Sequence, residues 1–153
     1  MCSHGRMNRR RQKKLTARLV MAAILGEHTE VRALLRTGVD PRIPNADGTT
    51  PLYAASVHGD TASVRALLAA GADPDTESGH GSEGTPLCGA ACWGHTDTVR
   101  VLLAHGADPH LREDGGIGLT PLAWAEAGGH AETAEALRTA GAATGSPRAD
   151  GCG

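Results

Sequence analysis

Residues 84–95 read Gly-Thr-Pro-Leu-Cys-Gly-Ala-Ala-Cys-Trp-Gly-His, and parts of this stretch return along the chain. The Thr-Pro-Leu motif recurs at intervals of 35 residues (86 − 51 and 121 − 86), with prolines at Pro51, Pro86 and Pro121. A mid-repeat glycine recurs at steps of 33, 35 and 35 (59 − 26, 94 − 59 and 129 − 94), at Gly26, Gly59, Gly94 and Gly129. A closing glycine follows the same steps, at Gly38, Gly71, Gly106 and Gly141. Independent series that share one period indicate a repeat array.

Each repeat is predicted to contain two helices. The threonine of Thr-Pro-Leu suits the N-cap, where its hydroxyl accepts a hydrogen bond from a free amide, and the proline suits the first helical position. The first helix ends at the mid-repeat glycine, which adopts the left-handed conformation readily. A second helix follows, as in residues 96–104, where Val99, Leu102 and Leu103 form an apolar stripe. In the first three repeats, an Asp-Pro pair after the closing glycine prevents the helix from continuing.

These motifs resemble the ankyrin repeat. Thr-Pro-Leu, Ala-Ala, Gly-His, Leu-Leu and Gly-Ala-Asp-Pro occur in the family's order and register, and the resemblance covers roughly residues 17–142. It implies an all-α, ankyrin-type solenoid of about four stacked helix-turn-helix repeats with projecting β-hairpin-like loops. It also implies a scaffold that binds a partner protein through the concave groove of its inner helices and through its loop fingers, with no catalytic machinery of its own.

The periodicity divides the chain into three parts. Residues 1–14 form a basic leader and residues 143–153 a tail, both expected to be disordered, and residues 15–142 form the repeat domain. The repeats are placed at about 15–42, 45–75, 83–110 and 118–142. The first repeat lacks Thr-Pro-Leu, and the last has Leu137 alone in place of Leu-Leu, which is typical of capping repeats at the ends of an array.

The second and third connecting loops, residues 75–84 and 110–118, are longer than the first. The distance from Asp-Pro to Thr-Pro is 13 residues (86 − 73 and 121 − 108) against 11 (51 − 40). Two interpretations remain open. Extra loop residues cost little entropy, so these loops have drifted in length, or they are extended fingers that contact a partner.

Residues 1–14 carry six basic side chains and no acidic one. The rest of the chain therefore holds nine basic residues (15 − 6) against 17 acidic ones, a balance of −8. A solvated leader, a contact with nucleic acid or another anionic surface, and an extension of the first helix all remain open for this segment. The acidic remainder favours a partner protein of basic character, because opposite charge speeds encounter.

Hydrophobic residues make up 40% of the chain but aromatic residues only 2%, with no phenylalanine. The core must therefore consist of Leu, Val and Ala, which suits closely stacked helices. No apolar run is long enough to cross a membrane, and no apolar stretch follows the charged start, so neither a membrane span nor a secretory signal is expected. The bias towards Ala, Gly and Arg over Lys favours a GC-rich, bacterial source.

The four cysteines do not form a disulfide framework. Cys2 and Cys152 stand near the ends, whereas Cys88 and Cys92 stand one turn apart on one predicted helix, which favours a reduced, cytoplasmic chain. Together with His95 they also suggest zinc. However, zinc takes four converging ligands, and no second Cys/His cluster shares their register. Packing is therefore the expected role, with no metal and no cofactor.

No catalytic set is recognisable. The sequence lacks a phosphate-binding loop that ends in Gly-Lys-Ser/Thr and a Gly-x-Ser-x-Gly nucleophile elbow, and its eight histidines are dispersed. We expect a monomeric protein that is not an enzyme, and that binds another protein rather than nucleic acid or a membrane.

Two departures from the family's pattern concern the inner helices. In the family a histidine after Thr-Pro-Leu fastens the loops, and its absence here predicts looser loops; the residues in its place are Tyr53, Cys88 and Ala123. Gly89 stands where the family prefers leucine. We expect this glycine to leave a gap that Trp124, at the same register one repeat later, fills.

The resemblance implies that two sets of positions face the partner, namely the two residues before each mid-repeat glycine and the tips of the loops. In the second and third repeats these residues are Val57, His58, Cys92 and Trp93, and the first finger carries Asp47 and Thr49. Tryptophan is enriched among binding hot spots, so Trp93 is the main candidate. The alternative is that Trp93 covers its own turn and the neighbouring inner helix.

Overall fold

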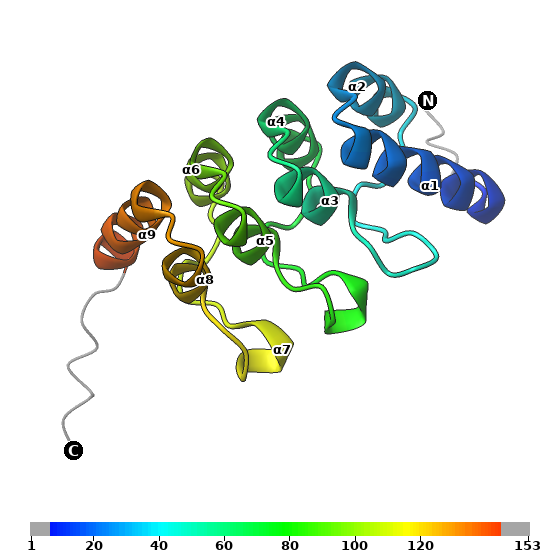
Figure 1. Ribbon diagram of the computed structural model, residues 1–153. Helices are drawn as coiled ribbons and strands as arrows, with labels where there is room; N and C mark the ends of the chain where they lie inside the picture. The colour runs from blue at the N-terminus through cyan, green and yellow to red at the C-terminus, as the bar shows by residue number, and fades with distance from the viewer. Residues whose placement is uncertain (1–6, 145–153) are drawn as a thin grey trace.

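The computed structural model describes residues 7–144, which form four helix pairs (Figure 1). The inner helices are α1 (Arg9–Leu25), α3 (Pro51–Val57), α5 (Pro86–Cys92) and α8 (Pro121–Ala127). The outer helices are α2 (His28–Arg36), α4 (Thr61–Ala69), α6 (Thr96–Ala104) and α9 (Ala131–Thr144). Each helix contacts its partner within the pair and its counterpart in the next pair, so the helices form two rows. The predicted all-α solenoid of four stacked repeats is confirmed.

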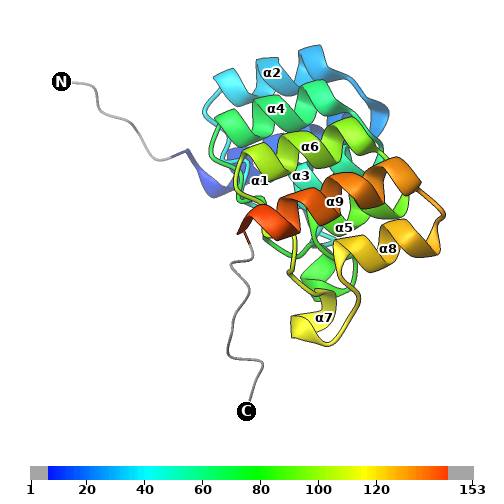
Figure 2. The ribbon, with the colours of Figure 1, turned by 90° about the vertical axis from the view of Figure 1, so that its left-hand side faces the viewer.

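The connecting loops project on the side of the inner helices (Figure 1, Figure 2). The second loop contains the 3-10 turn η1 (Gly79–Gly81), and the third contains the short helix α7 (Glu113–Gly116). Within residues 7–144, β-pairing is confined to one bridge between Ser78 and Gly84. The loops are therefore formed mainly by tight turns and not by β-strands. The surface made by the inner helices and these loops is called the inner face below.

The helix ends follow the local signals of the sequence. The hydroxyls of Thr50, Thr85 and Thr120 accept hydrogen bonds from the amides three residues on, at 3.3, 3.2 and 3.2 Å. The mid-repeat glycines have φ angles of 72, 68, 71 and 72° in chain order. This left-handed region is costly for residues with a Cβ, so glycine lets each chain segment turn at once from inner to outer helix.

The interior is built from small and branched aliphatic side chains. The largest fully buried ones include Leu19, Leu52 and Leu87 on the inner helices and Leu67 and Leu102 on the outer helices. The alanine pairs of α3 and α5 are at most 3% exposed, and they let neighbouring inner helices approach closely. None of the helices within residues 7–144 is long and apolar enough to cross a membrane.

Histidines of two turns fasten successive repeats. The Nε2 atom of His95 lies 3.0 Å from the carbonyl oxygen of Val57, and that of His130 lies 3.0 Å from the carbonyl of Cys92. Carbonyls at the end of a helix have no partner within the helix, so each histidine satisfies one of them. Hydroxyl pairs between outer helices add to this contact, namely Thr61 with Thr98 and Thr96 with Thr133.

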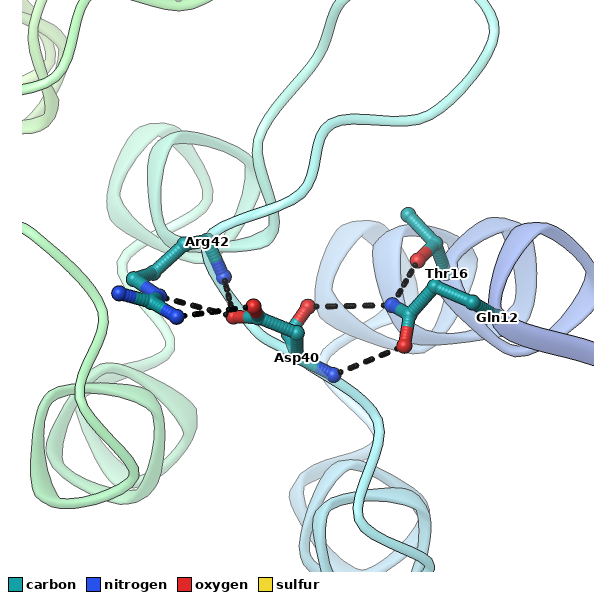
Figure 3. Close-up of polar contacts among 4 residues, drawn as sticks. All are labelled: Gln12, Thr16, Asp40 and Arg42. Carbon is teal, nitrogen blue, oxygen red and sulfur yellow. Dashed lines mark hydrogen bonds and ion pairs between the residues drawn. The ribbon is translucent and has the colours of Figure 1, made fainter. Parts of the chain in front are cut away.

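The prediction of a disordered leader is wrong for residues 9–14, which belong to α1; residues 1–6 of that leader lie outside the described chain. Gln12 supplies the reason (Figure 3). Its side-chain amide donates to the Asp40 carbonyl at 3.3 Å and accepts from the Asp40 backbone N–H at 3.2 Å. It also donates to the hydroxyl of Thr16 at 2.9 Å. These bonds hold the start of α1 against the first loop, so an extended first helix is the correct interpretation.

The same loop residue is fixed by an ion pair. The guanidinium of Arg42 donates to the Asp40 carboxylate at 3.0 and 3.1 Å, and this hydrogen bonding lowers the pKa of Asp40 (Figure 3). The bonds between Gln12 and Asp40 matter for the start of α1, because its basic residues lie at the positive end of the helix dipole, where their charge is unfavourable. Five of them are exposed: Arg9, Arg10, Arg11, Lys13 and Lys14.

The last helix is longer than predicted. Helix α9 runs through Gly141 to Thr144, so the prediction of a disordered tail is wrong for residues 143–144, and residues 145–153 lie outside the described chain. Gly141, unlike Gly38, Gly71 and Gly106, does not adopt a positive φ. The reason is that no Asp-Pro pair follows it, and alanines, which favour the helix, come next.

The turn glycines offer a matched test of the histidine contacts. An alanine Cβ at Gly26 would have no atom within 4 Å, whereas at Gly59 it would lie 2.6 Å from Nδ1 of His95. Both positions have left-handed φ, so Gly26→Ala should lower the free energy of unfolding by about 1–2 kcal/mol. Gly59→Ala should cost more, because it also displaces His95 from the Val57 carbonyl. Urea unfolding followed by circular dichroism measures both, and equal losses would contradict this role of His95.

Candidate functional site: the aromatic cleft of the inner face

The second loop is fastened by a serine and a carboxylate in place of the family's histidine. The hydroxyl of Ser78 accepts from the Thr50 backbone N–H at 2.9 Å and donates to Glu83 at 2.6 Å. Glu83 also accepts a hydrogen bond from the Thr49 hydroxyl at 2.9 Å. The backbone N–H of Gly79 donates to the Gly48 carbonyl at 2.8 Å. These bonds join the first and second loops, so the looser loops predicted from the missing histidine are not observed here.

The third loop is attached through Glu113. The indole N–H of Trp124 donates to the Glu113 carboxylate at 2.7 Å. The same carboxylate lies beside Gly84, where an added Cβ would displace it, and the φ of 97° at Gly84 favours glycine in any case. The Asp75 carboxylate accepts from the backbone N–H of Asp108 at 2.9 Å. Acidic side chains therefore align the second and third loops along the inner face.

A cleft of about 290 Å³ lies between these loops and the inner helices. Tyr53 of α3, Trp93 at the end of α5 and Trp124 of α8 line it. The sequence contains two tryptophans, one tyrosine and no phenylalanine, so every aromatic side chain of the chain borders this one cleft. Its acidic lining residues are Glu83, Glu113 and Asp114. We call this feature the aromatic cleft.

Gly89 lines the aromatic cleft, and the prediction that it leaves a gap is wrong. No gap is left for Trp124 to fill, because an added Cβ at Gly89 would lie 2.8 Å from Val57 and 3.1 Å from the ring of Tyr53. The preceding inner helix therefore occupies the space that a larger side chain would need. Trp124 instead points its indole N–H to Glu113.

The pKa values of Tyr53 and Glu113, two partly buried residues that line the aromatic cleft, are raised. Burial, and then the charges of Glu83 and Glu113, raise the pKa of Tyr53 to about 12. Burial also raises the pKa of Glu113, against the lowering effect of its bond to Trp124. No lysine, arginine or histidine of residues 7–144 lines the cleft. Arg112 precedes Glu113 in the sequence, but its guanidinium donates to the Gly118 carbonyl at 3.1 Å, and it does not line the cleft.

The predicted partner-binding residues separate into two groups. Cys92 and Trp93 line the aromatic cleft, and Val57 packs beside it against Gly89. Asp47 and His58 are exposed on the inner face but do not line the cleft, and Thr49 is half-buried and donates to Glu83.

Sequence reasoning missed several residues of the cleft. Tyr53 was predicted only to replace the family's histidine, and Trp124 only to fill a gap at Gly89, so neither was expected to face a partner. Glu83, Glu113 and Asp114 carried no signal, because loop acids are common and their meeting depends on the fold.

The two described cysteines differ in accessibility. Cys88 is buried, and burial raises its pKa to about 12, so it remains a thiol at neutral pH. Cys92 is half-buried, and neither cysteine forms a disulfide. Within residues 7–144 no three His, Cys, Asp or Glu side chains lie close enough to hold a metal ion.

The stacked helix pairs, with their loops and inner helices joined into one surface, define a repeat solenoid of the protein-binding class. A family model described as ankyrin repeats (3 copies) matches residues 2–78 and 77–146, and the chain belongs to the ankyrin repeat family. Members of this family are protein–protein interaction modules without catalytic machinery. No curated protein matches the chain, and nothing in these comparisons bears out the bacterial source expected from composition.

The single tyrosine provides a direct readout of the cleft. Its raised pKa means that the neutral phenol is favoured in the folded chain, and that phenolate forms only as pH rises towards 12. At about pH 10.5 the native protein should show less than half of the phenolate absorbance, and urea-unfolded protein more than half, since free tyrosine titrates near 10. Glu83→Gln with Glu113→Gln should move the native titration to lower pH. Identical native and unfolded curves would place Tyr53 in open solvent.

Proposed function

We propose that this protein is a non-enzymatic, monomeric scaffold that binds a basic partner protein through the inner face, with Trp93 as the main anchor. The observation that carries the proposal is the exposure of Trp93, which is 63% accessible although it is the bulkiest residue type in the chain. A tryptophan that packed in the hydrophobic core would be buried. An exposed indole at the rim of a cleft has a large apolar surface and one N–H donor for a partner.

The charge distribution supports a basic partner. Outside residues 1–14 the chain carries a balance of −8, and three of its acidic residues line the aromatic cleft. Such a field would steer a basic surface towards the inner face and raise the association rate more than the affinity. The free thiols of Cys88 and Cys92 suit a reducing compartment, and we place the interaction in the cytoplasm.

Replacement of Trp93 tests the proposal. Affinity capture from the native host with wild-type protein identifies the partner, and Trp93→Ala should then weaken its binding by about 2 kcal/mol or more. The thermal midpoint should change little, because Trp93 makes no hydrogen bond through its side chain within the described chain and is mostly exposed. Calorimetry and thermal unfolding measure the two effects separately.

Leu25 supplies a matched control. It stands before Gly26, at the register of Trp93 two repeats earlier, and is 61% exposed. Leu25→Ala removes an exposed apolar side chain from the same face but outside the aromatic cleft, and should weaken binding much less than Trp93→Ala does. A Trp93→Ala protein that unfolds early but binds normally would place Trp93 in a packing role and remove the proposal.

A second candidate function rests on α1. Five basic side chains are exposed along its first two turns, near the positive end of the helix dipole, and could contact nucleic acid or another anionic surface. Phosphate contacts would give affinity that falls steeply with salt. Replacing Arg9, Arg10 and Arg11 with glutamine should then reduce both the affinity and the salt slope, measured by fluorescence anisotropy with a labelled duplex. Unchanged binding in this variant would exclude the candidate.

A further inference from the structure

We propose that the aromatic cleft receives the side chain of an arginine from the partner protein. This inference rests on the proposed function, because it names the group of a basic partner that enters the cleft. It follows from the aromatic and acidic side chains that three successive repeats bring to one place.

The aromatic side chains are the first observation. The core is made without them, since its largest fully buried side chains are Leu, Val and Thr. Tyr53 and Trp124 are half-buried and Trp93 is exposed, so each presents ring surface to the cleft. Aromatic faces attract cations through the ring quadrupole, and tryptophan does so most strongly.

The carboxylates are the second observation. Glu113 is partly buried, lines the cleft and accepts the indole N–H of Trp124 through one carboxylate oxygen. Asp114 is exposed on α7, and its carboxylate makes no hydrogen bond within residues 7–144. Since no basic side chain of the described residues lines the cleft, these acidic groups have no counter-charge there. Burial, and then the charges of Asp114 and Glu77, raise the pKa of Glu113.

Arginine fits this combination better than the other candidates. Its planar guanidinium stacks on aromatic rings and directs several N–H donors to carboxylates at once, whereas a lysine ammonium is a compact and strongly hydrated charge. An apolar side chain would remove water from Glu113 and Asp114 without supplying donors, which costs free energy. The volume of about 290 Å³ lies just below the usual range for ligand pockets, and suits one side chain rather than a large ligand.

Short peptides test the inference without knowledge of the partner. The full chain is titrated with blocked Gly-Gly-Xaa-Gly-Gly peptides in which Xaa is arginine, lysine, trimethyllysine, glutamine or norleucine. Amide and indole NMR signals report the binding, because the two indole N–H groups both belong to the cleft. The arginine peptide should shift both indole signals and bind about ten-fold more tightly than the glutamine peptide.

Charge variants test the acidic lining. Asp114→Asn should reduce the affinity for the arginine peptide several-fold and preserve the loop, because asparagine tolerates the left-handed φ of 51° at this position. Glu113→Gln keeps an oxygen acceptor for Trp124 and should act in the same direction. Glu27→Gln removes a charge from an exposed carboxylate in the turn between α1 and α2, outside the cleft, and should leave the affinity unchanged.

Several outcomes would overturn the inference. Equal binding of the arginine and glutamine peptides would do so, as would tightest binding of norleucine, which indicates an apolar anchor. Tightest binding of trimethyllysine would indicate recognition of a quaternary ammonium instead. If no peptide binds but Trp93→Ala still loses the partner, the inference fails and the proposed function stands. If arginine binds in the cleft but Trp93→Ala and Asp114→Asn leave capture of the partner unchanged, the proposed function and the inference both fail, because the partner is then held elsewhere.

Discussion

The structure depends on the burial of each helix pair between its neighbours. A pair of short helices has an apolar surface that it cannot cover alone, so stability requires contact with the next pair. Alanines in the inner helices permit the close approach, and buried leucines such as Leu52 and Leu102 fill both rows. The left-handed glycine turns set the register of these contacts, because they bring each outer helix back over the inner helix before it.

Polar bonds between repeats add specificity to this apolar stacking. His95 and His130 each reach the end of the preceding inner helix, which fixes the spacing of the second, third and fourth repeats. The first repeat has Glu27 and the second Asp60 at this register, so the first interface lacks this contact. The docking of Gln12 on the backbone of Asp40 strengthens the first repeat by a different route.

The inner face acquires its chemistry from the way in which the loops are fastened. Carboxylates and a serine do the work that the family gives to histidine, so acidic groups are concentrated where the loops meet the inner helices. Because Gly89 has no side chain, Tyr53 and Val57 pack closely against it, and Tyr53 lines the cleft beside it. Loop fastening and the proposed recognition of a partner therefore use the same residues.

The sequence by itself determined the repeat period, the caps and turns of the helices and the family, because these depend on neighbouring residues and recur in register. It also placed Trp93 and Cys92 on the inner face. Only the tertiary structure decided that the start of α1 is ordered and that three aromatic side chains line one cleft, since both depend on residues far apart in the chain. Gln12 and Asp40 are separated by 28 positions, and Thr49 and Glu83 by 34. Such pairs have no local pattern, and stacking of the repeats is what brings their side chains within hydrogen-bond distance.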